Sequence, residues 1–442
     1  MPPPSLPALT PEPVLKRLET LGIRLGLETF GRLLDALGSP QLRFPSVLVA
    51  GSNGKGSTSA LVAAMASAAG YRTALYTSPH LESVEERLRL DGRSVSSEVL
   101  AGLLEEVVLA SESANGGLPT YFEALTAAAF LWFAREEVDL AVVEVGLGGR
   151  LDATNLCDPL LSLITSISLE HQEHLGDTLA AIAREKAGTF RPGRPALVWI
   201  EEPEAAESVR TVASERGTDL RFAPDLVTIR EIDSDAWTGQ RVRIGKHELK
   251  LHLSGEHQSR NLTLAVLAAE TLAGLGFPRL DTRAIAAGAE SCRWPGRLER
   301  VDLPGGRRVL LDAAHNAEGA AALAGFLARL PGPVNLLFGA LEDKNAADML
   351  GRLAPRAERV VLTTPASPRA RRPEELAVLL EGRTGVEVVP EPGEALDRAL
   401  EIPGTLVACG SIYLIGEVRN GLRERFGVPA PAADPLYYIS GS

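Results

Sequence analysis

The sequence predicts a two-domain α/β fold, in which a large domain with a mostly parallel sheet precedes a smaller, Rossmann-like α/β domain. The chain has 442 residues, more than the roughly 250 to 300 residues that one hydrophobic core usually supports. Short β-branched runs alternate with Ala- and Leu-rich stretches, as expected of βαβ units. The alternation starts again after WPGRLERV at 294–301, so we predict domains spanning residues 1–297 and 298–442.

The elements of the first domain follow from local patterns of apolar residues. Buried strands are predicted for SVLVA (46–50), RTALYT (72–77), DLAVVEV (139–145) and LLSLITSI (160–167), with helices at 57–70 and 121–137. Residues 239–255 differ, because apolar and polar residues alternate about Gly245 and Lys246. This alternation predicts an antiparallel hairpin at the far side of the first domain.

In the second domain the α/β alternation begins again. Its strands are predicted for RVLLDAA (308–314), PVNLLFGAL (333–341), RVVLTT (359–364), VEVVP (386–390) and TLVACG (405–410), separated by helical segments.

Composition and charge exclude several classes of function. The formal net charge of −12 argues against a general affinity for nucleic acid or for an anionic membrane. Cys157, Cys292 and Cys409 are far apart and suggest buried packing residues, not a disulfide framework or a zinc site. The N-terminal sequence has no signal-peptide pattern and no run of 18 apolar residues occurs, so we expect a cytoplasmic protein.

The stretch VLVAGSNGKGST at 47–58 has the features of a phosphate-binding loop. It follows an apolar strand and precedes a helix, whose unpaired N-terminal amides favour an anion. Glycines at 51, 54 and 56 permit close backbone approach, Lys55 supplies charge, and the Ser57 hydroxyl can reach a phosphate or a magnesium ion. The spacing departs from G-x-x-x-x-G-K-[ST], so a glycine turn with a solvated lysine is nearly as well supported by this stretch alone.

Other polar residues follow neighbouring strands at the same predicted sheet edge. Glu144 lies near the end of its strand, where an acid can hold magnesium beside phosphates, although it can equally pair with an arginine. Ser78 and His171 also follow strands. His171 and His174 are alternatively surface histidines, the commoner role of such a pair.

Short segments spread along almost the entire chain carry a family resemblance. They are AGSNGKGS (50–57), TSPHL (77–81), ERLRLDG (86–92), VVEVGLGGRLDATN (142–155), EHQEHLG (170–176), REKAG (184–188), HQSRN (257–261), WPGRLE (294–299), DAAHN (312–316) and GSIYLIGEV (410–418). With these segments the chain resembles the bacterial folylpolyglutamate synthase and dihydrofolate synthase group of the Mur ligase superfamily. The loop EVGLGGRLDATN is the most specific of them, since the wider superfamily shares the phosphate loop but not this loop.

The resemblance implies an ATP-dependent amide ligase that joins L-glutamate to a pteroate or folate carboxylate through an acyl phosphate. Such chemistry depends on positioning and charge neutralisation around the γ-phosphate. The implied ATP contacts are Asn53, Gly54, Lys55, Gly56, Ser57, Asn261, Arg297 and Asp312. Closure of the second domain would complete the site.

The resemblance also implies one or two Mg²⁺ ions, held by Ser78, Glu144 and His171. An imidazole is an unusual ligand for a hard cation, so the assignment of His171 is weaker than that of Glu144. Lys186 matches a lysine that is carbamylated in this family, whereas sequence alone suggests a solvated helix lysine. His315 is expected to position glutamate or phosphate, or else to cap the following helix.

The pterin-binding region is less well marked. The implied contacts are Gly26, Leu27, Pro79, Thr120, Tyr121, Phe122, Glu123, Leu151, Asp152 and Ala153. Phe122 offers a ring for stacking or simply packs in its helix. Thr29, in this region, stands where the family commonly has a basic residue, a departure that bears on substrate preference. Ser52, Glu170, Ala313 and Asn345 are milder departures that leave the reaction type intact.

The main alternative is a cell-wall Mur ligase that acts on a nucleotide-linked muramyl peptide. Such ligases usually carry a further N-terminal domain, whereas here the phosphate loop begins at Gly51. A nucleotide switch or kinase would leave the second domain without a role. We therefore expect a ligase, most simply a monomer, whose partners are small molecules: the pteroate or folate substrate, L-glutamate and ATP.

Overall fold

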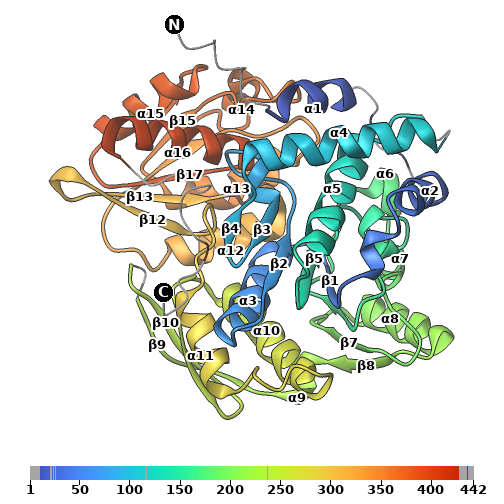
Figure 1. The fold of residues 1–442 in the computed structure, drawn as a ribbon. Coiled ribbons are helices and arrows are strands. Elements are labelled where there is room, and N and C mark those ends of the chain that lie inside the picture. The colour runs from blue at the N-terminus through green and yellow to red at the C-terminus, as the bar shows by residue number, and fades with distance from the viewer. Residues whose placement is uncertain are drawn as a thin grey trace, which may run out of the picture.

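The computed structural model describes residues 10–19, 22, 24, 26–114, 117–235, 237–427 and 436. Within them, two parallel-rich sheets and a small antiparallel sheet are arranged with helices on their faces (Figure 1). We call α1 to α11, with the strands between them, the first lobe, and β12 to α16 the second lobe.

The first lobe is built on an eight-stranded sheet of order β4-β3-β2-β5-β1-β6-β7-β8. The six strands β2, β5, β1, β6, β7 and β8 are parallel, and β3 and β4 add an antiparallel edge beside β2. Their bounds are β1 (Ser46–Ala50), β2 (Thr73–Tyr76), β3 (Leu88–Leu90), β4 (Arg93–Ser94), β5 (Leu140–Glu144), β6 (Leu161–Ile164), β7 (Pro195–Val198) and β8 (Asp219–Phe222). The four strands predicted in this region are confirmed.

Helices cover both faces of this sheet, because its central strands are buried on both sides. One hydrophobic cluster joins the sheet to the helices α1 (Glu12–Leu18), α2 (Glu28–Ala36), α4 (Ser97–Ser113), α5 (Tyr121–Arg135), α7 (Leu179–Ala187) and α8 (Pro203–Arg216). A second cluster joins the other face to α3 (Lys55–Ala68), α10 (Glu256–Gly274) and α11 (Thr282–Ser291). Short helical segments complete the lobe: η2 (Pro40–Leu42), η3 (Val84–Arg87), η4 (Ala153–Leu156), α6 (Gln172–Leu175) and α9 (Ala223–Leu226).

The predicted hairpin is confirmed as β10 (Gly239–Ile244) and β11 (His247–Leu251), which pair antiparallel. A third strand, β9 (Ile229–Asp235), pairs with β10 at the edge. Alternate residues of β10 and β11 are buried against the α3 side of the first lobe, whereas β9 is almost wholly exposed.

The second lobe is a six-stranded sheet of order β12-β13-β17-β14-β15-β16, parallel except for β12. Its strands are β12 (Glu299–Leu303), β13 (Arg307–Asp312), β14 (Val334–Phe338), β15 (Arg359–Leu362), β16 (Val386–Val388) and β17 (Thr405–Cys409). The helices α12 (Ala317–Leu327), α13 (Ala346–Leu353) and α14 (Pro373–Val378) cover one face, and α15 (Pro392–Glu401) and α16 (Ile412–Phe426) the other. Two short 3-10 segments, η5 (Pro304–Gly306) and η6 (Ala354–Arg356), complete it. The predicted two-part α/β fold class is thus confirmed; the boundary between residues 297 and 298 stays a prediction.

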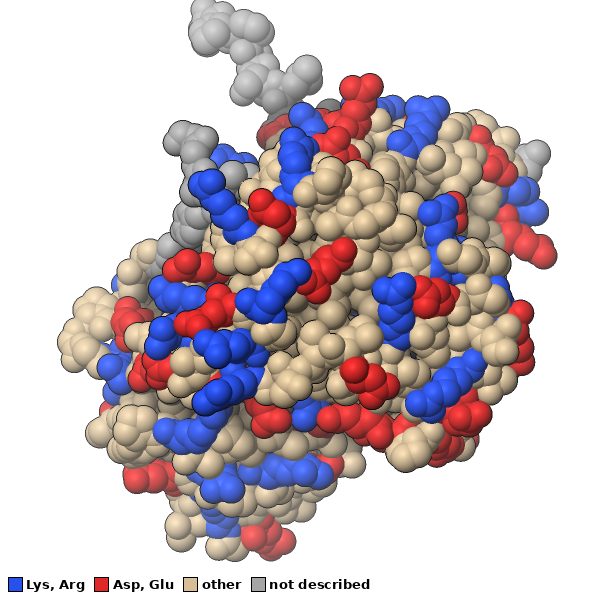
Figure 2. All heavy atoms as spheres, turned by 90° about the horizontal axis from the view of Figure 1, so that it is seen from below, with Lys and Arg blue, Asp and Glu red and all other residues tan. Residues whose placement is uncertain are grey.

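The surface mixes charges of both signs. In Figure 2, blue and red side chains alternate over the face that is shown, without a broad basic area. Within the described residues, no helix is long and apolar enough to cross a membrane. Cys157, Cys292 and Cys409 are buried, each in a hydrophobic cluster, as expected for packing residues.

Candidate functional site

A cavity of about 260 Å³ lies where β1, β5 and β6 end and the second lobe meets the first. Ligands of open parallel sheets usually bind outside the carboxyl ends of the strands, so this is the expected place for a site. The predicted site residues that line it are Asn53, Gly54, Lys55, Gly56, Ser57, Ser78, Pro79, Glu144, His171, Asn261, Arg297, Asp312 and His315.

Two loop glycines are required by close contacts. Gly51 has φ +145°, and a Cβ there would lie 1.9 Å from Oγ1 of Thr165. Gly54 has φ +86°, and its Cβ would lie 2.3 Å from Oδ1 of Asn261. Positive φ values and the missing space both select glycine. The loop is therefore shaped by contacts with β6 and α10, which rules out the interpretation as a simple surface turn.

The helix α3 begins at Lys55 directly after this loop. Its N-cap has no side-chain hydrogen bond, so the first amides remain available to an anion. Lys55 Nζ donates to the carbonyls of Gly51 (2.8 Å) and Ser52 (3.1 Å). Gln258 Nε2 donates to the hydroxyl of Ser57 (3.3 Å), a contact that the sequence interpretation did not include. Cationic and amide donors thus converge on one end of the cavity.

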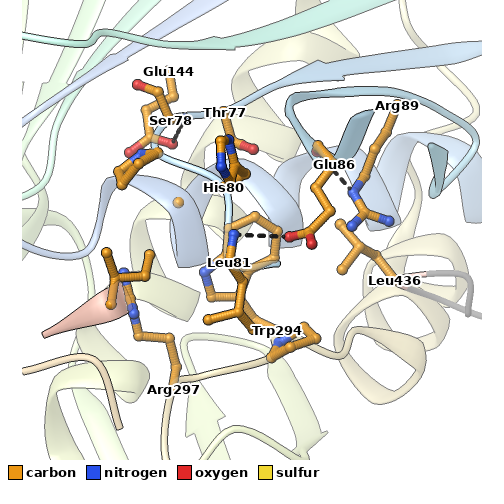
Figure 3. Close-up of a pocket in the computed structure, with 14 residues that line it drawn as sticks. Thr77, Ser78, His80, Leu81, Glu86, Arg89, Glu144, Trp294, Arg297 and Leu436 are labelled. Carbon is orange, nitrogen blue, oxygen red and sulfur yellow. Dashed lines mark hydrogen bonds between the residues drawn. The ribbon is translucent and has the colours of Figure 1, made fainter. Parts of the chain in front are cut away.

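Glu144 ends β5 and faces the same space. Its Oε2 accepts a hydrogen bond from the backbone N–H of Ser78 at 3.1 Å, as Figure 3 shows. The side chain is buried, and burial raises the pKa of Glu144 to about 6, although Lys55 opposes this shift. At neutral pH most of the carboxylate is still ionised, so the protein holds a costly buried anion beside its phosphate loop.

Lys186, on α7, is buried and not the solvated helix lysine that sequence alone suggested. Its Nζ donates to Glu170 (2.7 Å) and to the carbonyl of Gly51 (3.0 Å). Burial lowers the pKa of Lys186 to about 8, with Glu170 opposing. Burial also disfavours the Glu170 anion, yet Lys186 and Lys55 hold the pKa of Glu170 down at about 2. The two side chains form an ion pair at neutral pH.

His171 has φ +45° and precedes the short helix α6. Its side chain is exposed at the mouth of the cavity, whose walls desolvate it enough to lower its pKa. His174 is exposed, as a surface histidine would be.

Arg297, in the connection between the lobes, and Asp312 and His315, in the second lobe, complete the cavity. Asp312, at the end of β13, accepts hydrogen bonds from the amides of Leu298 (2.8 Å) and Ala314 (2.9 Å). Burial raises the pKa of Asp312, opposed by Arg297, and burial lowers the pKa of His315 to about 4. Nδ1 of His315 lies 2.9 Å from the Ala313 carbonyl, which only accepts, so the neutral ring keeps its free lone pair on Nε2.

Asn53 joins the phosphate loop directly to the second lobe. Its Oδ1 accepts from Asn316 Nδ2 at 2.9 Å, and its own Nδ2 donates to Glu318. Asn316 also caps α12. Neither Asn316 nor Glu318 was predicted as a site residue. Asn316 is the last residue of the DAAHN motif, but the motif alone does not indicate that Asn316 contacts the distant phosphate loop.

The residues expected around the pterin lie on neighbouring elements. Thr120 and Glu123 form a capping box at the start of α5, and Glu123 also pairs with Arg24 (3.7 Å). The carboxylate of Asp152 accepts hydrogen bonds from the amides of Leu147 (2.8 Å) and Thr154 (3.0 Å). Glu123 and Asp152 therefore stabilise the local backbone at the start of α5 and in the loop before η4.

Phe122 has a more open position. Its ring packs over Gly146, where a Cβ would lie 2.5 Å from Cζ, and Gly146 itself lines the cavity. Tyr121 lies under the Arg87 guanidinium at 5.3 Å, and Pro79 lines the cavity directly. Of the remaining predicted residues, Gly26, Leu27 and Leu151 lie on the connections that lead to α2 and η4, and Ala153 is the first residue of η4.

The donor set fits a metal that is shared with phosphates. Within the described residues, no three His, Cys, Asp or Glu side chains are grouped to hold an ion by themselves. Glu144, with one hydrogen bond to its carboxylate, and the Ser78 beside it supply oxygens. A hard divalent cation commonly takes one or two carboxylates and completes its shell with substrate phosphates and water.

Comparisons with known proteins agree with this geometry. The model of the Mur ligase middle domain matches residues 49–269, and that of the Mur ligase glutamate ligase domain matches residues 296–411. The dihydrofolate synthase/folylpolyglutamate synthase of Mycobacterium tuberculosis is 38% identical over 86% of this chain and 82% of its own length. A probable bifunctional folylpolyglutamate synthase/dihydropteroate synthase of Haloferax volcanii is 35% identical over 91% of this chain, which spans about half (49%) of that relative.

Solved structures match over nearly the whole chain. E. coli FolC in complex with DHPP and ADP superposes with a TM-score of 0.83 at 32% identity, over 94% of this chain and 98% of that chain. A bifunctional folylpolyglutamate synthase/dihydrofolate synthase with Mn, AMPPNP and L-glutamate bound has a TM-score of 0.81 at 30% identity, over 94% and 98% of the two chains.

Proposed function

The chain belongs to the folylpolyglutamate synthase/dihydrofolate synthase group of the Mur ligases, and from that premise we propose the substrates and residue roles of its reaction. It is an ATP-dependent ligase of folate metabolism that attaches glutamate, and it binds nucleotide with a divalent metal ion. We propose that L-glutamate is joined to the carboxylate of dihydropteroate, of a tetrahydrofolate polyglutamate, or of both.

The proposed reaction has two chemical steps. The substrate carboxylate attacks the γ-phosphorus of ATP, which gives an acyl phosphate and ADP. The neutral amine of glutamate then attacks the acyl carbon, loses a proton, and expels phosphate as the amide forms. Lys55, the first amides of α3 and Ser57 hold the phosphates and neutralise charge, which is where such reactions gain most of their rate.

We propose Mg²⁺ as the metal. Glu144 and Ser78 are the residues that fit it best, and His171 stays the weaker candidate because hard cations prefer oxygen. When bound, the ion would neutralise phosphate charge. The buried Glu144 carboxylate supports this assignment, since a buried anion facing a cavity is stabilised by a cation.

We propose that His315 accepts the proton that the glutamate amine loses. The hydrogen bond to Ala313 leaves the lone pair of Nε2 free to accept a proton. Burial lowers the pKa of His315 to about 4, and the negative charge of bound phosphates would raise it toward the range in which a general base works. Asn261, Arg297 and Asp312 are proposed ATP contacts across the cavity.

Carbamylation of Lys186 is a further proposal. A neutral amine and CO₂ give a carbamate with release of one proton, and the pKa of about 8 leaves part of the amine neutral near pH 7.5. The reaction requires Lys186 to leave its ion pair with Glu170. Mass spectrometry of the native protein at raised CO₂ pressure, with Lys186→Arg as the control, should find one added CO₂ in the wild type only.

The pterin is proposed to lie beside Phe122, because this ring packs over the cavity-lining Gly146. The monomeric state and the cytoplasmic location stay predictions.

The observation that carries the proposal is the single cavity in which phosphate-loop donors, Glu144 and His315 meet. Purified protein should release phosphate from ATP only when dihydropteroate or tetrahydrofolate and L-glutamate are both present. Lys55→Ala should abolish turnover and keep the circular dichroism spectrum. Turnover with UDP-muramyl substrates, and none with either pteroate compound, would instead establish the cell-wall alternative.

A further inference from the structure

A buried ion-pair cluster joins the two lobes away from the cavity. Arg419, on α16, donates through Nη1 to Glu82 and through Nε to Glu299, each at 2.8 Å. The exposed fractions of these three side chains are 4%, 6% and 16%. Arg423, one turn later on α16, also pairs with Glu82. Glu82 belongs to the first lobe, and Glu299 begins the second.

The cluster lies on the loop that leads to the metal-binding candidates. Glu82 follows Ser78 and Pro79 in the loop after β2, and Ser78 holds Glu144 through its amide. The Glu86 carboxylate fixes this loop by accepting the amides of Leu81 (3.0 Å) and Glu82 (2.8 Å). A displacement of Glu82 would therefore move the short segment from Ser78 to Glu86, which is held together by these hydrogen bonds.

Glu299 extends the cluster to the connection between the lobes. Its Oε2 accepts the amide of Gly296 at 2.8 Å, next to Arg297 of the cavity. Leu298, which follows, has φ +45°, a conformation that a non-glycine residue keeps only when its surroundings impose it. Arg419 thus holds the strand-end loop with one nitrogen and the interlobe connection with another.

Packing at the same place is close. Leu81, in the strand-end loop, packs against the hydrophobic cluster of the second lobe, and Figure 3 shows it in the small pocket that Trp294 also lines. A Cβ at Gly416 of α16 would lie only 2.2 Å from the Leu81 carbonyl oxygen. The helix can approach the loop this closely only because residue 416 is a glycine.

From these contacts we infer that Arg419, with Glu82 and Glu299, is an interlobe lock that holds α16 against the strand-end loop and so keeps Arg297 and His315 facing the phosphate loop. Arg419 is a positioning residue and touches no substrate. Its activity readout rests on the proposed ligase reaction, whereas its structural readout does not.

The lock predicts a specific kinetic effect. If substrates bind before the lobes close, weaker closure lowers kcat in proportion to the closed fraction and changes KM little. Arg419→Met should lower kcat about 10- to 100-fold, Glu82→Gln about 10-fold, and Arg419→Lys less than Arg419→Met, because a retained charge preserves part of the pairing. Small-angle X-ray scattering should give a larger radius of gyration for Arg419→Met and Glu82→Gln.

The helix α16 offers matched controls. Arg425 pairs with Asp397 inside the second lobe (2.7 Å), so Arg425→Met should keep kcat within twofold and the wild-type scattering curve. Gly416→Ala and Gly421→Ala gain the same helix propensity, but only the first places a methyl against the other lobe; at residue 421 the neighbours are Leu396 and Arg425. Gly416→Ala should behave like Arg419→Met, and Gly421→Ala like the wild type.

Two results would refute the proposed lock. One is wild-type kcat and wild-type scattering in both Arg419→Met and Gly416→Ala, and the other is a loss of kcat without any change in scattering. If Arg419→Met does not fold, Glu82→Gln, Arg419→Lys and Gly416→Ala decide in the same way. A wild type that never turns over pteroate and glutamate refutes the proposed function, while the scattering comparison still tests the lock.

Discussion

Two acids occupy equivalent places in the two lobes and are used differently. Glu144 ends β5 in the first sheet, and Asp312 ends β13 in the second. Both are buried, and burial raises the pKa of each. Within the described chain, Glu144 accepts one backbone hydrogen bond, through Oε2, whereas both oxygens of Asp312 accept one, from Leu298 and Ala314.

This difference indicates that Glu144 serves to bind a ligand, whereas Asp312 serves to fix the local backbone. Glu144 lines the cavity, and among the described residues its buried charge has no ion-pair partner within 4 Å, an arrangement that is common at functional sites. Asp312 fixes the backbone with both oxygens: Oδ2 accepts from Leu298 in the interlobe connection, and Oδ1 accepts from Ala314 in the loop after β13, so its contact with a ligand would be additional. The contrast predicts that neutralising Glu144 affects chemistry most, whereas neutralising Asp312 affects the fold most.

The largest expected effect is on turnover. Glu144→Gln keeps the shape but removes the charge that is proposed to hold the metal, so kcat should fall about 1000-fold, roughly 4 kcal/mol of transition-state stabilisation. Phosphate release at saturating substrates measures it. The exposed Glu105 on α4 gives the control, because Glu105→Gln should keep kcat within twofold. Equal losses in both variants would refute the special role of Glu144.

The next effect tests the chemistry of the second lobe. His315→Gln removes the proposed proton acceptor and should lower kcat about 100-fold, the usual size of a general-base contribution. The pKa of His252 is also lowered by burial to about 4, but His252 lies by β11, outside the cavity. His252→Gln should therefore keep wild-type kcat. If His315→Gln is equally active, the second lobe contributes shape but no base.

The sequence predicts such residues better than it predicts their partners. The strand at 46–50 and the order of the motifs are local, and β1 has the predicted bounds. The strand predicted at 160–167 ends early, at Ile164, because Thr165 and Ser166 leave the sheet to bond the phosphate loop. Here the predicted run extends beyond the paired strand because its last residues contact the phosphate loop.

Contacts between distant segments were not predictable. Asn53 with Asn316, and Arg419 with Glu82, join residues more than 260 positions apart. Short strands such as β7 were also not identified, because four residues pair only when a neighbouring strand is in place. The pattern specifies the elements, while tertiary packing alone decides which of them meet.

The third effect sharpens the contrast from the Asp312 side. Asp312→Asn places an amide N–H against one of two backbone N–H donors, so a buried donor loses its acceptor and the free energy of unfolding should fall by about 2 to 3 kcal/mol. Urea unfolding measures it. Asp302 on β12 has a side chain that is 77% exposed, so Asp302→Asn should change stability by less than about 0.5 kcal/mol. No destabilisation by Asp312→Asn would remove its shaping role.

The smallest effect has the opposite sign and belongs to Glu144. Its pKa of about 6 in the fold, against 4.5 for the free side chain, means that the native state binds the extra proton between these values, so stability falls as pH rises through this window. The ionised carboxylate costs about 2 kcal/mol above pH 7, since each pKa unit is worth about 1.4 kcal/mol. Glu144→Gln should thus be about 2 kcal/mol more stable than the wild type at pH 8 and nearly equal to it at pH 4.5.

Thermal melts at both pH values, without nucleotide or metal, measure the difference, with Glu105→Gln as the control. If Glu144→Gln loses turnover and is more stable than the wild type only at the higher pH, the Glu144 charge destabilises the fold and serves ligand binding. If the variant and the wild type are equally stable at both pH values, a partner within the fold already neutralises Glu144.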